Sequence, residues 1–368
     1  MPLHFHRVRW LYRRVFKGAG VLLLAAFGLF AAPGANAIET APAGTVPAGT
    51  VAVNHAVALM YHRFGEDAHP TTSVTLDQFE AHLQELKNGD YTVRPLPEIL
   101  NRLREGKPLA DRTVAITVDD AFLSVYTEAW PRLKAAGFPM TLFIATQAID
   151  RGGKDYMSWS QIRELLRDGV TIGSQTETHL HMPLADAETV AGELARSNAR
   201  FLDELGIRPT LFAYPYGETS LAVQEATRKA GFVAAFGQHS GVLHPGEDFF
   251  YLPRFAFNEN FGDLARLRLA AGARPLPVKD VTPRDPLLGK DNNPPNFGFT
   301  VAAEIPALDR LRCYGSSQGQ AELVQLGERR FEVRLAAPFP KGRARINCTL
   351  RSREGRWRWY GRQFYVTE

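Results

Sequence analysis

Two adjacent carboxylates, Asp119 and Asp120, directly follow the apolar segment 113–118 (TVAITV). Carboxylates that leave a buried strand side by side repel each other and must be desolvated together. A bound cation relieves this cost by neutralising one of them, and the other can then act as a general base on a water molecule. The pair therefore indicates a metal-assisted hydrolytic site or, since Asp is common in turns, a solvated turn.

A second polar cluster follows the apolar segment 170–173 and contains Gln175, His179 and His181. Gln175 and His179 are four residues apart, so one helical turn would place them on the same side. A single His is more often structural than a metal ligand. A His after one strand and an Asp pair after another together favour a shared metal site.

A third segment, residues 211–217 (LFAYPYG), also passes from an apolar strand into a loop. Pro215 and Gly217 favour a tight turn whose backbone N–H groups could face an oxyanion. Taken alone, the same residues describe an ordinary aromatic turn. The functional interpretation therefore depends on the two preceding segments.

The elements that would position these residues alternate between strand and helix. We expect strands at 57–61, 113–118, 141–145, 170–173 and 211–213. We expect helices after a capping box at 75–78, over 124–136, from 158 to Gly169, and over 186–205. Repeated units of this kind predict a parallel sheet in a barrel or an open fold. In such folds, chemistry lies at the C-terminal ends of the strands.

In their order and spacing, the three segments resemble the first three motifs of the polysaccharide deacetylase family. That family has the NodB homology domain and is classed as carbohydrate esterase family 4. The resemblance covers about residues 56–260. It implies an α/β fold, a distorted (β/α) barrel of the NodB type, that binds a divalent metal ion such as zinc, cobalt or nickel.

The resemblance also implies roles for individual residues. Asp119 corresponds to the catalytic base and Asp120 to a metal ligand. Gln175 and His179 occupy the positions of the two metal-binding histidines, and the backbone N–H of Tyr216 would stabilise the oxyanion. Three further residues are expected at the substrate: Tyr214, Pro215 and Arg254.

The segment 59–62 (LMYH) resembles the branch that contains the poly-N-acetylglucosamine deacetylases of bacterial biofilms. In that branch, a His just after the first strand serves as the general acid. We therefore expect His62 to protonate the leaving amine or alcohol, with a His that merely caps the strand as the alternative. His239 and His244 are lesser candidates for the acid.

Two departures from the family pattern affect the site. Gln175 replaces a metal-binding His, and an amide oxygen is a poorer ligand for zinc-like ions than imidazole. Either Gln175 ligates in a weaker site, or His181 takes its place, or metal and catalysis have been lost. Ala213 stands where the wider family has an Arg that orients the base, and Arg254 could supply that charge from another strand.

The first 37 residues have the three parts of an export signal. Basic residues extend to Lys17, an apolar stretch covers 18–32, and residues 35–37 (ANA) fit a cleavage site. The apolar stretch is short for a membrane span, which needs about 20 residues, so we prefer cleavage to a permanent anchor. The mature chain is then periplasmic or secreted, exported by the Sec or the twin-arginine route.

The leader also accounts for the basic character of the chain. The net charge is +4, and residues 1–37 contain five basic and no acidic residues, which leaves −1 for the rest. No global charge therefore favours a nucleic-acid partner. The expected partner is an acetylated polysaccharide, and the sequence does not indicate an oligomeric state.

Composition divides the rest of the chain. We expect a flexible linker at 38–55, the deacetylase domain at 56–274, a Pro- and Asp-rich linker at 275–297 and a small all-β, sandwich-like domain at 298–368. Cys313 and Cys348 are expected to form a disulfide in an oxidising compartment, with two free buried thiols as the alternative. The segment 356–360 (RWRWY) would stack on sugar rings or, as we prefer, pack against the barrel.

Together these patterns predict a metal-dependent hydrolase that removes acetyl groups from a cell-envelope or exopolysaccharide glycan. We expect the groups to be N-acetyl, with O-acetyl as the alternative. Because of Gln175, the alternative is a non-catalytic glycan-binding protein that uses a degenerate barrel. A binding protein needs no metal, so metal content would distinguish the two.

Overall fold

The central sheet consists of parallel strands in the order β11-β10-β9-β8-β7-β2-β12, in a computed structural model that describes residues 51–368. The predicted leader and most of the first predicted linker lie outside the described residues. The strands are β2 (Val57–Tyr61), β7 (Thr113–Asp119), β8 (Met140–Ile144), β9 (Thr171–Ser174), β10 (Leu211–Ala213), β11 (Ala234–Phe236) and β12 (Phe255–Ala256), and β5 (Thr92–Val93) pairs with β7. Strands β2, β7, β8, β10 and β11 consist entirely of buried residues, as expected of a parallel sheet covered on both faces.

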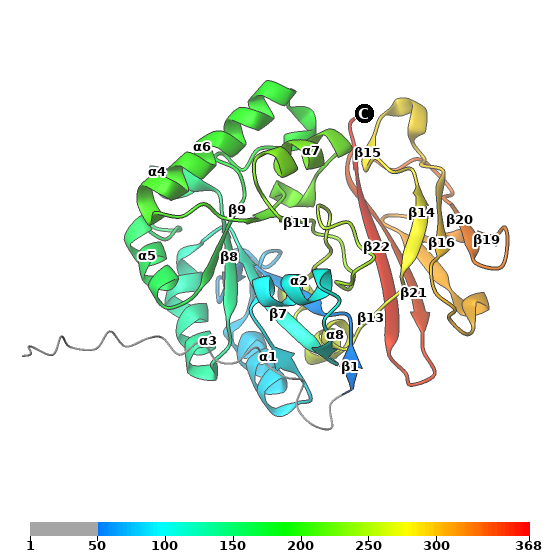
Figure 1. The fold of residues 1–368 in the computed structure, drawn as a ribbon, viewed down its shortest axis with the longest axis horizontal. Coiled ribbons are helices and arrows are strands. Elements are labelled where there is room, and N and C mark those ends of the chain that lie inside the picture. Colours follow the sequence, from blue (N-terminus) through cyan, green and yellow to red (C-terminus); the bar gives the residue numbers. More distant parts are fainter. Residues whose placement is uncertain (1–50) are drawn as a thin grey trace, which may run out of the picture. The chain divides into compact units, whose positions relative to one another are not determined.

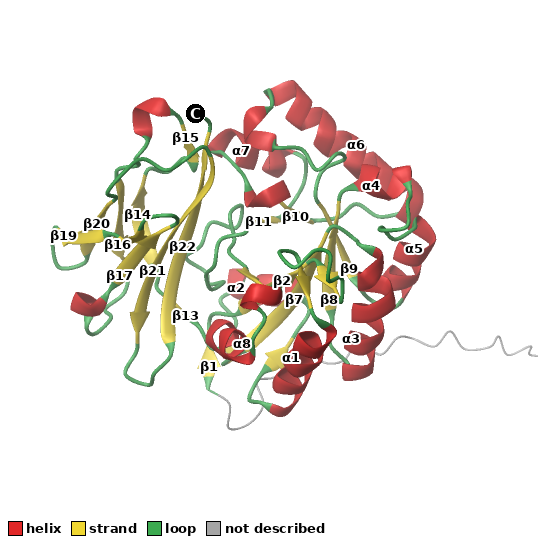
Figure 2. Cartoon of the chain, turned by 180° about the vertical axis from the view of Figure 1, so that it is seen from behind, coloured by secondary structure: helices red, strands yellow, loops and turns green. Residues whose placement is uncertain are grey.

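Helices connect these strands. They are α1 (Leu76–Asn88), α2 (Leu96–Arg104), α3 (Trp130–Ala136), α4 (Thr146–Arg151), α5 (Trp159–Arg167), α6 (Ala187–Leu205), α7 (Leu221–Lys229) and α8 (Leu264–Ala271). Figures 1 and 2 show α1, α3, α5, α4 and α6 following one another along the outer side of the sheet. Capping boxes start α1 at Thr75 and α5 at Ser158, because each N-cap hydroxyl and the glutamine three residues later bond to each other's backbone.

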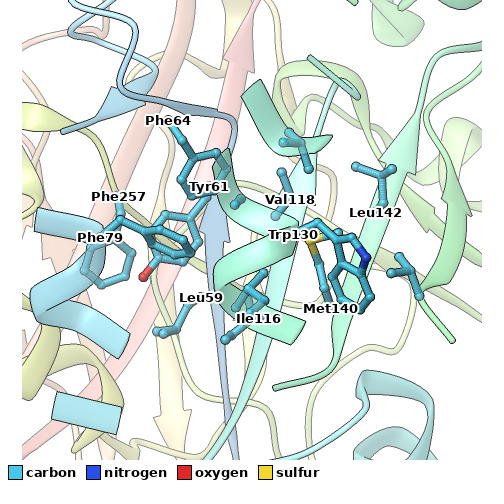
Figure 3. Packing of buried hydrophobic residues seen from close by; sticks show 14 of the residues in the cluster. Leu59, Tyr61, Phe64, Phe79, Ile116, Val118, Trp130, Met140, Leu142 and Phe257 are labelled. Atoms are coloured by element: carbon cyan, nitrogen blue, oxygen red, sulfur yellow. The ribbon is translucent and has the colours of Figure 1, made fainter. Parts of the chain in front are cut away.

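Alternate residues of the strands build two separate cores. Leu59, Ile116 and Val118 face the larger cluster, which includes residues of α1, α3, α5 and α8. Figure 3 shows part of it, with the ring of Tyr61 in contact with Phe79 and Phe257. The intervening positions hold smaller residues such as alanine, and they pack with α2. The two faces together fix the register of the strand ends, where the polar residues follow.

The C-terminal residues form two further sheets that enclose a core of their own. One has the order β13-β22-β21-β17-β18 with β15 beside β22, and the other the order β14-β16-β20-β19. Their strands are β13 (Arg274–Pro275), β14 (Val278–Thr282), β15 (Leu287–Leu288), β16 (Phe297–Val301), β17 (Arg312–Gly315), β18 (Gly319–Gln320), β19 (Glu322–Gln325), β20 (Arg330–Arg334), β21 (Gly342–Arg351) and β22 (Trp357–Val366). Short pairs elsewhere are β1 (Ala52–Val53) with β6 (Leu109–Ala110) and β3 (Arg63–Phe64) with β4 (Ser73–Val74).

The predicted disulfide is confirmed. Cys313 of β17 and Cys348 of β21 are directly opposite in the antiparallel pairing and are bonded to each other. The segment 275–297, which we expected to be a linker, differs from that expectation because it contains β14 and β15. Its proline and aspartate content was the basis of the linker prediction.

The β domain contacts the barrel through β22 and the residue that precedes it. Trp359 lies edge-on to Phe255, with ring centroids 5.4 Å apart, and packs on the larger barrel core. Arg356 pairs with Asp111, and the hydroxyl of Tyr251 donates to the carbonyl oxygen of Gln363 at 2.7 Å. The packing we preferred for the segment 356–360 is therefore observed at Trp359. Among residues 51–368, no helix has the length and apolar character that crossing a bilayer requires.

Candidate active site

Asp119 ends β7 with a fully buried side chain that is held by Arg254. Two parallel bonds join them, Nη1 to Oδ1 at 2.7 Å and Nη2 to Oδ2 at 2.8 Å. Arg254, which directly precedes β12, is also fully buried, and its Nε donates to the carbonyl oxygen of Gly237 at 3.1 Å. The pair satisfies a carboxylate that burial would otherwise make costly, and fixes its orientation.

His62 lies beside the same carboxylate. Tyr61 of β2 pairs with Val118 of β7. The residues that follow them in the chain, His62 and Asp119, therefore lie close together at the same edge of the sheet. The Nε2 atom of His62 is 3.9 Å from Oδ2 of Asp119. His62 also lines the cleft described below, so its ring has access to a ligand.

Asp120 turns away from Asp119 because its backbone adopts a left-handed conformation, with φ of 75°. Its N–H donates to the carbonyl oxygen of Phe143 at 3.0 Å and to Oε1 of Gln175 at 3.2 Å. Its Oδ1 is 3.4 Å from Nε2 of His179. Burial raises the pKa of this carboxyl, but interactions with His179 and His62 outweigh it and hold the pKa below its usual value.

The segment that carries Gln175 and His179 is a loop, so the predicted helical turn is wrong. Thr176 and His179 both have positive φ, 69° and 63°. The hydroxyl of Thr176 accepts the N–H of His179 at 3.1 Å, and the carboxylate of Glu193 accepts the N–H of Thr178 at 2.8 Å. Side chains thus take the backbone donors that a helix would have used. The loop still brings His179 to Asp120.

Two of the three predicted metal ligands fit a divalent ion. In a tetrahedral site with bonds of about 2.0–2.1 Å, ligand atoms lie roughly 3.3–3.4 Å apart, which matches the 3.4 Å between Asp120 Oδ1 and His179 Nε2. Within the described residues, that Oδ1 is buried without a hydrogen-bond partner. Carboxylate and imidazole are both common zinc ligands.

Gln175 is oriented differently. Its Oε1 accepts the N–H of Asp120, so the buried amide nitrogen Nε2 is left without a hydrogen-bond partner in the described part of the chain. An amide NH₂ donates and cannot ligate a cation. Ligation through Oε1 would require the bond to Asp120 to be given up. In line with this, residues 51–368 contain no cluster of three or more His, Cys, Asp and Glu side chains that could hold a metal ion.

The loop after β10 makes a single tight turn at residues 215–217. Tyr216 has φ of 59°, and Gly217, with φ of 71°, has no room for a side chain because a Cβ would lie 2.5 Å from the backbone N of Gln238. The amide of Gln363, on β22, donates to the carbonyl oxygen of Tyr216 at 3.1 Å. The conformation of the predicted oxyanion loop is therefore fixed from both domains.

Two histidines enclose the ring of Tyr216. His179 meets it edge-on at a centroid distance of 4.4 Å, and His181 stacks on it at 4.1 Å. His181 is held by the buried carboxylate of Glu218, with 2.6 Å between Nδ1 and Oε2. The structure therefore places His181 beside the oxyanion loop rather than at Asp120.

Several predicted residues lie behind the site. Tyr214 and Arg254, which we expected at the substrate, are fully buried, and the hydroxyl of Tyr214 donates to the carbonyl oxygen of Phe250. Neither lines the cleft, because both point into the core of the barrel. Pro215 is buried too. The lesser candidates His239 and His244 contact Tyr251 and Glu247, outside the cleft.

A cleft of about 660 Å³ opens over these residues. The barrel contributes His62, Asp120, His179 and Tyr216 to its lining. The β domain contributes Trp359, from the segment 356–360, and three residues that we did not predict: Arg343, Arg345 and Asn347. Polar residues at every second position of one strand, 343, 345 and 347, were the signal that could have revealed this face.

Comparison with known proteins agrees with the geometry. Residues 106–235 match the family model described as polysaccharide deacetylase. The chain carries a polysaccharide deacetylase domain. The poly-beta-1,6-N-acetyl-D-glucosamine N-deacetylase of Staphylococcus aureus (strain MSSA476) is 26% identical over 236 residues, which is 56% of this chain and 80% of the relative.

Solved structures show the same fold for the deacetylase domain. IcaB from Ammonifex degensii superimposes with a TM-score of 0.54 at 26% identity and covers 60% of this chain and 98% of its own. The Streptococcus pyogenes deacetylase PplD, solved in complex with acetate, gives 0.55 at 20% identity and covers 60% and 99%. The predicted family, fold class and hydrolase class are confirmed.

Proposed function

We propose that this polysaccharide deacetylase removes N-acetyl groups from a cell-envelope or exopolysaccharide glycan with the help of a divalent metal ion. The domain itself supports glycan deacetylation. The proposal of metal-assisted N-deacetylation rests on the side chains grouped at one edge of the sheet. Arg254 holds Asp119, and Nε2 of His62 lies 3.9 Å from Oδ2 of Asp119. Beside them, Oδ1 of Asp120 faces Nε2 of His179. This grouping offers a base, an acid and a cation site together.

In this proposal each side chain has one task. A divalent ion bound by Asp120 and His179 would polarise the acetyl carbonyl and lower the pKa of a water molecule. Asp119 accepts the proton of the attacking water, and Arg254 keeps its carboxylate aligned. The N–H of Tyr216 donates to the oxyanion that develops at the carbonyl oxygen of the acetyl group. His62 gives a proton to the leaving nitrogen, so that water and amide become acetate and amine.

Gln175 contributes indirectly in this scheme. Its bond to the N–H of Asp120 fixes the left-handed backbone that separates the two carboxylates. With only two protein ligands, the remaining positions on a metal ion would belong to water and substrate, and the ion would be held more weakly than by three ligands. The disulfide supports an extracytoplasmic location, periplasmic or secreted.

The test is acetate release by purified residues 38–368 from N-acetylglucosamine oligomers and acetylated polymers. It is run with added Zn²⁺ or Co²⁺ and with chelator. We expect metal-dependent release that Asp119→Asn abolishes. Asp111→Asn is the matched control, because it also removes a carboxylate charge that is paired with an arginine, outside the cleft. Release that chelator does not reduce, or that survives Asp119→Asn, would contradict the proposal.

The second candidate is a glycan-binding protein without catalysis. The orientation of Gln175 favours it, because its Oε1 is taken by the N–H of Asp120 and the amide does not present the oxygen that a cation needs. Purified protein that retains no metal, binds the glycan and releases no acetate would support this candidate.

A further inference from the structure

The wall of the cleft that comes from the β domain is basic. Arg343, Arg345 and Asn347 alternate along β21 and therefore share one face, which lines the cleft together with Asp120. Arg266 of α8 adds a third guanidinium from the barrel side. Three arginines thus stand against one aspartate among the charged residues that line the cleft.

Two of these arginines lack an acidic partner among the described residues. Within the described residues neither Arg266 nor Arg345 forms an ion pair. Arg345 Nε donates to the neutral amide oxygen of Gln363 at 2.9 Å. Arg343 forms a looser ion pair with Glu218, with 3.8 Å between Nε and Oε1. The described residues therefore neutralise only part of the positive charge that lines the cleft.

Arg266 lies against two aromatic rings. Its guanidinium carbon is 5.3 Å from the ring centre of Phe255 and 5.8 Å from that of Trp359, and its Nε is buried without a hydrogen-bond partner in the described part of the chain. Burial lowers the pKa of Arg266 and of Arg345. A partly desolvated cation without a counter-charge is costly, and a ligand anion would remove that cost.

We propose that this wall, formed by Arg266, Arg343 and Arg345, binds an anionic substituent of the substrate, so that the enzyme acts on an acidic acetylated polysaccharide. A carboxylate of a uronic acid and a phosphate ester share the required chemistry, because both accept the paired N–H groups of a guanidinium. Trp359 and Phe261, which also line the cleft, offer apolar faces to the sugar rings. The proposal rests on the proposed function, because it assumes that the bound glycan is deacetylated. Binding of the anionic group can nevertheless be measured without any reaction.

The same charge has a consequence for the product. Removing an acetyl group leaves an amine that is protonated at neutral pH. The arginines would repel this new cation while they hold the neighbouring anion, so the wall would bind the acetylated substrate more tightly than the product. A neutral polymer of N-acetylglucosamine would gain nothing from these contacts.

The test measures binding by calorimetry with residues 38–368 and chelator present, so that neither turnover nor a bound cation contributes. A hyaluronan hexasaccharide, in which N-acetylglucosamine alternates with glucuronate, is compared with a chitin hexasaccharide. N-acetylglucosamine 6-phosphate against N-acetylglucosamine tests the phosphate source. We expect at least about tenfold tighter binding of one anionic probe, weakened by added NaCl.

Variants identify the residues. Arg343→Gln and Arg345→Gln should each weaken binding of the anionic probe about tenfold and leave binding of the neutral one unchanged. Arg351→Gln is the matched control, because it removes the same charge from the same strand outside the cleft. Equal binding of anionic and neutral probes, no binding of either anionic probe, or no effect of the two variants would each overturn the proposal. Acetate release from neutral oligomers, by contrast, bears only on the proposed function.

Discussion

Replacing Arg254 by Met should destabilise the protein strongly, because it leaves the carboxylate of Asp119 buried without its partner. Both side chains are fully buried and are joined by bonds of 2.7 and 2.8 Å. At an effective dielectric constant of about 20, the attraction between two such charges is roughly 4–5 kcal/mol. Breaking a buried pair from one side costs about 3–5 kcal/mol. We therefore expect the free energy of unfolding in urea to fall by about 3–5 kcal/mol.

The double variant with Asp119→Asn separates the charge effect from lost packing. If the unpaired carboxylate causes the loss, adding Asp119→Asn to Arg254→Met should recover about 2 kcal/mol or more relative to the sum of the single variants. Arg268→Met, which removes an exposed pair with Glu85 at 2.8 Å, should cost less than about 1 kcal/mol. A coupling energy below about 0.5 kcal/mol between Arg254 and Asp119 would refute the reasoning, because the carboxylate would then not depend on the guanidinium.

Two further predictions concern metal and pH. Gln175→His should tighten Zn²⁺ binding about tenfold or more, because it supplies the third ligand that the native amide does not present. Competition with a chromogenic chelator measures this affinity, and an unchanged affinity would mean that the ion binds elsewhere. Burial lowers the pKa of His55 from 6.5 to about 4, so the folded state holds it neutral and stability should fall as the pH drops from about 6.5 to 4, by about 3 kcal/mol in all. His55→Asn should flatten that part of the pH profile of urea unfolding, and a profile identical to that of the wild type would contradict the assignment.

Periodicity identified the barrel well, because its strands and helices are long or sharply bounded. The strand at 57–61 and the strand at 211–213 have the predicted bounds, and the helix at 187–205 differs by one residue from our expectation. Capping residues at Thr75 and Ser158 marked helix starts because their hydroxyls bond to the backbone in the structure. Local chemistry of this kind is written in neighbouring residues, and sequence alone can show it.

The site was less predictable where side chains take over the backbone donors. The spacing of Gln175 and His179 suggested a helical turn, but Thr176 and Glu193 accept the N–H groups of that segment and make it a loop. Glu193 lies on the following helix, so the residues near Gln175 could not predict its hydrogen bonds to this segment. For the same reason the arginines of β21 went unnoticed, since only the tertiary fold brings a strand of the second domain to the cleft.

The β domain is therefore part of the proposed site. Gln363 of β22 donates to the carbonyl oxygen of Tyr216, and its own carbonyl oxygen accepts the hydroxyl of Tyr251. Two positions earlier, Gly361 approaches the barrel so closely that a Cβ would lie 2.1 Å from the carbonyl oxygen of Ser240, which lines the cleft. One strand thus contacts two loops of the barrel at the cleft and supplies Trp359 to its wall. Because the oxyanion loop has a positive φ at Tyr216, which costs free energy in isolation, the contact from Gln363 helps to hold a conformation that the barrel must otherwise maintain alone.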